Sequence, residues 1–208
     1  MKKALLCTAA ALLVVSGSAM AQRADQPGHK SPAPGSNIEA VSAAQDAVAG
    51  MVGTVSAEMT TTTQGFATAA AISDMYEVAA GKAALQRAAS PAVKDFAQKM
   101  IDAHTQSSAK LKSLVSNGKT KVKLPEHVDN RRQGMLDNLR GASKADFDHR
   151  YMTQQVAAHR EADRLMQGYA EDGDNAAIRG FARETGKHVK MHLDMAEKLH
   201  GKSRTASR

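Results

Sequence analysis

Cysteine and tryptophan are nearly absent from the 208-residue sequence, which contains one Cys and no Trp. The cysteine, Cys7, lies in an N-terminal stretch that we expect to be removed, so the mature chain should carry no thiol. Without thiols the protein cannot form disulfides, thiolate nucleophiles or zinc–thiolate sites, and any metal has to be bound through nitrogen, oxygen or thioether ligands. Aromatic residues make up 3% of the sequence, so the core has to be built from Ala, Leu, Val and Met.

The N-terminus has the features of a cleaved secretory signal peptide. Two lysines precede the apolar run ALLCTAAALLVV, and the sequence AMA at 19–21 supplies the small residues that a signal peptidase requires. The run is short for a membrane span, and no later stretch approaches about 20 apolar residues. We therefore expect residues 1–21 to be removed, which leaves a periplasmic chain that begins at Gln22 and has no transmembrane span.

Positive charge is unevenly distributed along the chain, whose formal net charge is +7. No Lys or Arg occurs between Lys30 and Lys82, whereas lysines gather in residues 110–123 and the C-terminal tail is basic. Such patches are suited to weak contacts with anionic envelope polymers. No aromatic interleaving or nucleic-acid-binding motif accompanies them, so no nucleic-acid partner is expected and solvated helix ends are the simpler interpretation.

Segments rich in proline and glycine divide the rest of the chain. Residues 22–37 hold three of the five prolines among Gly, Ser, Lys and Asp, which is the composition of a flexible linker. The residues that follow show no alternation of β-branched and polar side chains, so the fold is expected to be all-α. Turn-forming residues then divide the chain into long helices of about 64–89, 91–117, 144–171 and 175–200.

The predicted helix boundaries depend on capping residues. Ser90 followed by Pro91 is an N-cap with proline at the first helical position. Ser143 with Asp146 resembles a capping box, which predicts that a helix opens there. The Gly-Asp pair at 173–174 is expected to close that helix and to cap the next one.

A long connection between Gly118 and Gly141 joins the first helical hairpin to the second, and one short helix is expected after Pro125. Two hairpins joined by a long crossover form the ferritin-like arrangement of a four-helix bundle. We therefore assign residues 63–200 to a ferritin-like four-helix bundle and residues 201–208 to a basic tail.

Residues 38–62 precede this bundle and are expected to form an accessory helix. Their apolar positions recur alternately three and four residues apart, with one polar member, as in a heptad seam. Three alternatives are open: packing on the bundle of the same chain, a disordered segment, because Gly50, Gly53 and the threonines at 60–63 weaken a helix, and pairing in a homo-oligomer. The seam consists of Ile38, Val41, Gln45, Val48, Val52, Val55 and Met59.

Each of the four long helices places one metal-competent side chain on its apolar face. Counted from Ser90, Glu77 and His104 differ in height by about 1.5 Å, so they should be neighbours. Counted from residue 173, His188 is level with His159, whereas His192 is displaced by about one turn. Asp163, on the expected helix of about 144–171, is a further candidate ligand or neighbour of a ligand. The candidate metal ligands and their neighbours are therefore Glu77, His104, His159, His192, His188 and Asp163.

Two interpretations of this polar cluster remain open. One is a mononuclear transition-metal site for Fe, Mn, Zn or Cu. The other is a set of hydrogen-bonded packing residues in a non-catalytic envelope or interaction protein, which would need a complete polar network. A ferritin di-iron centre needs Glu-x-x-His pairs on two helices, and Glu197-His200 is the one such pair here. Neither a ferroxidase centre nor another enzymatic motif is indicated.

An ordered set of sequence motifs resembles one known family. The segment GFATAAAISDMYEVAAGKAALQRAASPAVKDFAQKMIDAH is followed by LP, FDHRYM, AAH and HLDMA. This order is similar to that of the exported bacterial family called domain of unknown function four-one-four-two, and the resemblance covers about residues 64–199. It implies a ferritin-like bundle in the periplasm and no established activity.

Overall fold

The computed structural model describes residues 36–58, 60–116 and 121–206, and the regular secondary structure of this part is entirely α-helical. The expected all-α class is therefore confirmed. The predicted signal peptide and most of the predicted linker lie outside the described residues. The helices are α1 (Ser36–Glu58), α2 (Thr63–Arg87), α3 (Pro91–Ser116), α4 (Asn130–Gly141), α5 (Phe147–Asp172) and α6 (Ala176–Ala206).

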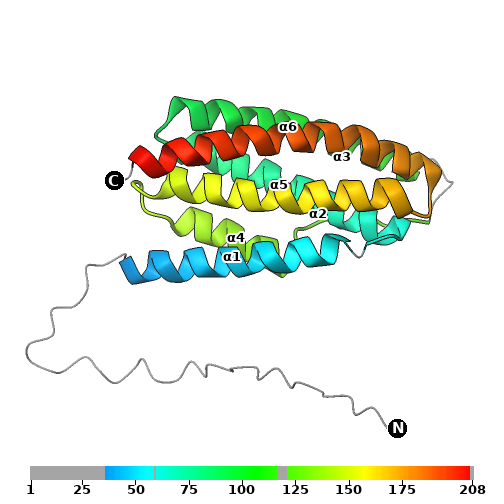
Figure 1. Ribbon diagram of the computed structural model, residues 1–208, viewed down its shortest axis with the longest axis horizontal. Helices are drawn as coiled ribbons and strands as arrows, with labels where there is room; N and C mark the ends of the chain where they lie inside the picture. The colour runs from blue at the N-terminus through cyan, green and yellow to red at the C-terminus, as the bar shows by residue number, and fades with distance from the viewer. Residues whose placement is uncertain (1–35, 59, 117–120, 207–208) are drawn as a thin grey trace, which may run out of the picture. The chain divides into compact units, whose positions relative to one another are not determined.

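Four long helices form the body of the described domain (Figure 1). Helix α2 packs against α3, and α5 packs against α6, so each pair is a hairpin. Helix α2 also contacts α5, and α3 contacts α6, while the short helix α4 covers α2 within the connection between the hairpins. No described helix combines the length and the low polarity that a membrane span requires.

The turn between α2 and α3 confirms the boundary that Ser90 and Pro91 predict. Helix α3 begins at Pro91, and the carbonyl of Ser90 accepts from the amides of Val93 and Lys94, each at 3.1 Å. The carboxylate of Asp148 accepts a hydrogen bond from the Ser90 amide at 2.8 Å. Because Asp148 belongs to α5, this turn also joins the two hairpins.

The turn between α5 and α6 differs from the prediction by one residue. Asn175, rather than Asp174, caps α6, because its Oδ1 accepts from the amides of Ala177 at 3.0 Å and Ile178 at 3.2 Å. Asp174 instead accepts from the Thr63 amide at 2.8 Å, which fastens the start of α2 to this turn. Helix α6 also continues to Ala206, beyond the predicted end at 200, and α5 begins at Phe147, three residues after the predicted start at 144.

The core consists of two apolar clusters with buried polar side chains between them. One cluster includes Phe96, Met100 and Tyr151, and the other includes Phe66 and Phe181. Helices α2, α3, α5 and α6 each contribute to both clusters, and each has at least one buried polar residue near the point where it passes from one cluster to the other. We call these residues the polar layer: Asp74 and Glu77 on α2, His104 on α3, His159 on α5 and His192 on α6.

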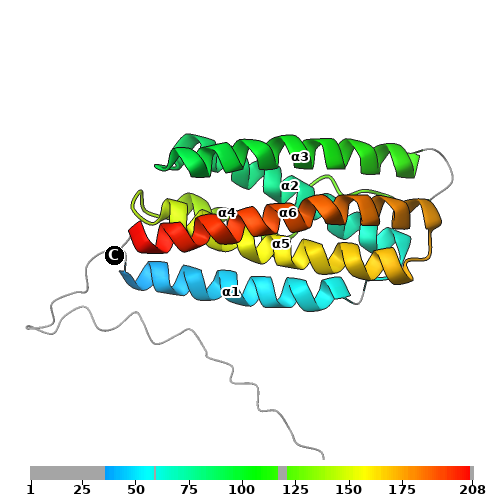
Figure 2. The same ribbon diagram turned by 45° about the horizontal axis from the view of Figure 1, so that its top comes forward.

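Helix α1 packs against α5 and α4. The buried carboxylate of Asp46 accepts from Arg150 at 3.2 Å and from Gln154 at 2.7 Å, both on α5. A Cβ added at Gly50 would lie 3.1 Å from the Cβ of Ala157, so glycine allows the two helices to approach closely. Figure 2 shows α1 and α3 on opposite sides of the domain, with α5 and α6 between them.

The predicted seam of α1 does not face the bundle at the positions that the structure describes. Val41 and Val48 are 57% and 56% exposed, and Gln45 is exposed as well. The opposite face of α1 contacts the bundle instead. This face carries small residues and Asp46, which pairs with Arg150, so it allows α1 to approach α5 more closely than a row of valines would. The side chains of the remaining seam residues lie outside the described part: Ile38, Val52, Val55 and Met59.

Candidate metal centre

Three histidines from three helices meet in the polar layer. One ring nitrogen from each of His104, His159 and His192 lies within 4.8 Å of those of the other two. The ring centroids of His104 and His192 each lie 5.7 Å from that of His159, and they are 6.0 Å from each other. The Nε2 atoms of His104 and His159 and the Nδ1 atom of His192 are buried and have no hydrogen-bond partner. Buried nitrogens without partners are costly in an apolar core, so this arrangement needs an explanation.

His104 is oriented by a carboxylate on the neighbouring helix. Its Nδ1 donates a hydrogen bond of 2.7 Å to Asp74 Oδ1, and Ser108 Oγ donates to the second carboxylate oxygen at 3.1 Å. This bond turns Nε2 of His104 towards the other histidines. A carboxylate that accepts from the far nitrogen of a histidine is a common partner of metal-ligating imidazoles, because it fixes the ring and increases its basicity.

His159 is oriented by the backbone of its own helix. Its Nδ1 donates to the carbonyl of Gln155 at 2.9 Å, which leaves Nε2 as the nitrogen that can accept or coordinate. The side chain of Gln155 donates to Glu77 Oε2 at 2.7 Å. The other carboxylate oxygen of Glu77 lies 3.8 Å from His159 Nδ1. Glu77 is thus placed behind the histidine ring rather than beside its free nitrogen.

Burial lowers the pKa of all three imidazoles, and their neighbours make the resulting pKa values differ. Burial lowers the pKa of His104, but the hydrogen bond to Asp74 and the charge on Glu77 outweigh it, so the pKa ends above its usual value. Burial and the nearby His104 lower the pKa of His159 to about 3. Burial and the neighbouring histidines likewise lower the pKa of His192 to about 3. His159 and His192 are therefore neutral at physiological pH, which is the form that binds metals.

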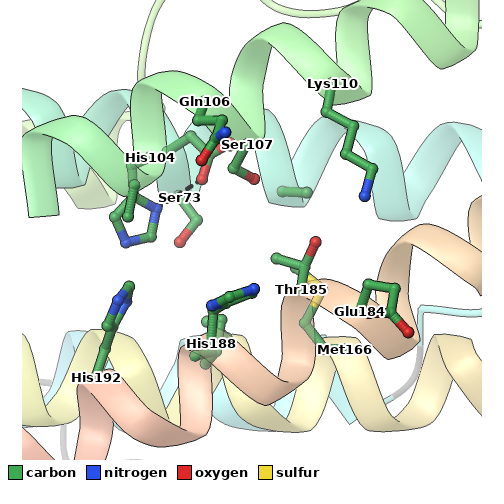
Figure 3. Close-up of a pocket in the computed structure, with 15 residues that line it drawn as sticks. Ser73, His104, Gln106, Ser107, Lys110, Met166, Glu184, Thr185, His188 and His192 are labelled. Carbon is green, nitrogen blue, oxygen red and sulfur yellow. Dashed lines mark hydrogen bonds and ion pairs between the residues drawn. The ribbon is translucent and has the colours of Figure 1, made fainter.

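A cavity of about 260 Å³ leads from the surface to the histidines. His104 on α3 and His192 on α6 point towards each other at its inner end (Figure 3). Exposed residues, including Lys110 and Glu184, lie at its outer end. His159 does not line the cavity. An ion held by the three rings would therefore have one side directed towards solvent-accessible space.

The structure brings His192, rather than His188, level with His159. Thr153 on α5 contacts His200 on α6 at 3.1 Å. His159 lies six residues after Thr153, and six residues before His200 is position 194, which is two residues from His192. At 1.5 Å per residue, His192 is then about 3 Å from the height of His159, and His188 is about 9 Å away. The prediction that His188 is level is wrong, because it centred the turn at residue 173, before α6 begins.

The remaining predicted residues occupy different places. Glu77 is buried against Gln155 and His159, as described above. His188 is exposed and lines the cavity between its inner and outer ends. Asp163 is partly buried on α5, outside both the three-histidine group and the cavity lining. Sequence reasoning did not assign Gln155 a role, since a glutamine next to another glutamine carries no distinguishing pattern.

The arrangement can accommodate a single metal ion after a small closure. In a tetrahedral site with metal–nitrogen bonds of 2.0–2.1 Å, two ligand nitrogens are about 3.3 Å apart. The observed separations of up to 4.8 Å therefore require the rings to approach one another by about 1.5 Å at most. Neither Asp74 nor Glu77 forms an ion pair with Lys or Arg within the described chain, so a dication would balance their two charges.

A comparison with protein families identifies the chain. The family model described as Domain of unknown function (DUF4142) matches residues 51–199. The chain belongs to this family. The match begins within α1 and extends through most of α6, so the polar layer lies wholly inside the DUF4142 domain. No curated protein and no solved structure matches the chain.

Proposed function

We propose that this DUF4142 protein is an exported, periplasmic, ferritin-like bundle that binds one transition-metal ion through His104, His159 and His192, in metal handling or envelope stress. The observation that carries the proposal is the convergence of three buried imidazoles, each with a nitrogen that has no partner. Packing histidines would be expected to satisfy both ring nitrogens, since an orphaned buried acceptor or donor costs about 1–3 kcal/mol.

The donor set indicates which ions fit. Imidazole suits Zn, Cu and Fe, whereas Mn prefers carboxylate and water. Both carboxylates of the polar layer are engaged by other side chains, Asp74 by His104 and Glu77 by Gln155. The three nitrogens therefore favour Zn, Cu or Fe over Mn.

The ferritin-like assignment and the export rest on different observations. Two hairpins, α2–α3 and α5–α6, joined by a connection that contains α4, support the ferritin-like assignment. The basic N-terminus, the short apolar run and the small residues at 19–21 support export, and these residues lie outside the described structure.

One observation favours a second function. Three of the four exposed large apolar side chains among the described residues, Val41, Val48 and Met51, lie on α1, as would suit an interaction protein that binds no metal. Metal content separates the two functions, because the second one predicts that none is retained.

The test is elemental analysis of protein isolated from the periplasm without chelator or affinity tag. We expect one equivalent of Zn, Cu or Fe per chain, and an intact mass that corresponds to a chain starting at Gln22. Wild-type protein that holds less than about 0.1 equivalent of any transition metal, and takes up none on titration, would contradict metal binding. A mass that includes residues 1–21 would contradict export by cleavage, independently of the metal result.

A further inference from the structure

We infer that the cavity beside the three histidines is a binding site for a small anion, which would take the open coordination position of the metal. The inference rests on the proposed metal site and adds the class of its exogenous ligand. It depends on the shape of the cavity, on its uncommitted hydrogen-bond donors and on the charge at its entrance.

The cavity connects two of the metal ligands with solvent. At its inner end, His104 and His192 are each 6% exposed, and both have a buried nitrogen without a partner. At its outer end, Lys110 and Glu184 are exposed. Three protein ligands leave at least one position of a tetrahedral metal open. The cavity is the described route by which a ligand can reach that position.

The size of the cavity suits a small ligand. Pockets that hold drug-sized ligands measure roughly 300–1,000 Å³, and this cavity, at about 260 Å³, lies just below that range. It therefore has room for a small ion together with accompanying water.

Uncommitted hydroxyl groups in the cavity wall can donate hydrogen bonds to a ligand. The side chains of Ser73, Ser107 and Thr185 line it and form no hydrogen bond with another described residue. The carboxylate of Asp74 is already used, because it accepts from His104 and Ser108. The wall therefore offers three hydroxyl donors to a ligand that accepts hydrogen bonds, and its carboxylate, whose oxygens already accept from His104 and Ser108, is less available to repel an anion.

Charge at the entrance favours the same class of ligand. Lys110 and Glu184 face each other across the outer end (Figure 3), and His188 lies further in. Glu184 accepts from Lys187 at 3.0 Å, so its charge is compensated. Lys110 forms no ion pair with a described carboxylate, and its Nζ lies 6.0 Å from the centre of the Phe181 ring. Glu184 thus has two lysines near it, Lys110 and Lys187, so the local charge at the mouth is positive and attracts anions.

The test uses cobalt(II) as the metal and azide as the anion. Cobalt-loaded protein should change its visible absorption spectrum on addition of azide, with saturation, because an added ligand alters the coordination of the metal. Lys110→Gln should weaken azide binding by about 3- to 5-fold, as expected for one partly exposed charge. Lys112→Gln, which alters an exposed lysine of the same helix outside the cavity, is the matched control and should leave the azide affinity unchanged.

The outcomes separate the anion site from the metal site. A loaded protein whose spectrum does not respond to azide, or an azide affinity that is the same in Lys110→Gln and in wild type, would overturn the anion site and leave the metal site standing. Failure to retain cobalt or any other transition metal, measured by elemental analysis of the same samples, would overturn both.

Discussion

A saturating concentration of the bound transition metal should raise the melting temperature of the wild-type protein by about 5–10 °C and leave that of His159→Ala unchanged. A ligand that binds only the folded state adds about 2.7 kcal/mol to the free energy of unfolding when its free concentration is 100 times its Kd. For a domain of this size each kcal/mol corresponds to about 2–4 °C. His159 is fully buried among the other two histidines, so its removal takes away one of three ligands.

The comparison is made between metal-free and metal-loaded samples of each variant, by calorimetry. His159→Ala also loses stability without metal, because a buried ring is replaced by a cavity, so each variant serves as its own reference. His127→Ala is the matched control, since His127 is exposed and outside the polar layer. Equal shifts in wild type and in His159→Ala would place the bound metal elsewhere on the protein.

The metal-free protein should lose stability steeply as the pH falls from 6.5 to 5. The folded pKa of both His159 and His192 is about 3, below the value near 6.5 of an unfolded histidine. Between these values the unfolded state binds more protons, so stability decreases as the pH falls. In this window each of the two histidines lowers the free energy of unfolding by about 1.4 kcal/mol for each pH unit of acidification. The effect of His104 on stability has the opposite sign. Because its folded pKa is raised, the stability that it contributes is complete below pH 6.5 and is lost as the pH rises through the folded pKa.

Urea unfolding of chelator-treated protein at several pH values measures this slope. The double variant His159→Leu/His192→Leu should show a much flatter dependence between pH 6.5 and 5, since neither side chain titrates. His127→Leu should retain the wild-type slope, as its ring is exposed in the folded state. If the double variant has the same slope as wild type, the low proton affinity of the buried histidines is not the source of the acid sensitivity.

Helix boundaries could be predicted where capping residues mark them. Ser90 and Pro91 gave the start of α3 correctly, because proline is tolerated at the first helical position and disrupts later ones. In the turn between α5 and α6, Asp174 and Asn175 are both suitable N-cap residues. Asn175 caps α6 because the carboxylate of Asp174 accepts a hydrogen bond from the Thr63 amide instead. That contact joins residues far apart in the sequence, so no local pattern reveals it.

The face of α1 that packs on the bundle was not predictable from apolar spacing. Val41 and Val48 fit a heptad seam, yet they are exposed, while Asp46 is buried against Arg150. A buried carboxylate depends on its partner being present, and that partner lies on α5. The spacing of apolar residues therefore could not predict the orientation of α1, which depends on an ion pair with another helix.

Three histidines of the candidate site could be predicted, because they lie on the apolar faces of their helices. His104, His159 and His192 interrupt apolar faces at positions that lie inside the core, and the structure brings them together. The level of His188 was mispredicted, since the relative height of two helices depends on the geometry of their turn. The orienting contacts of Asp74 and Gln155 depend on rotamers, which the sequence does not specify.

X-ray absorption spectroscopy of the metal-loaded protein tests the central claim most directly, because it counts the ligands of the bound ion. We expect three imidazole nitrogens at about 2.0–2.1 Å and one oxygen ligand from solvent. The imidazole scattering contribution should be reduced in His104→Ala. A first shell made only of oxygen atoms, or an imidazole contribution that is unchanged in His104→Ala, would contradict a metal centre built from His104, His159 and His192.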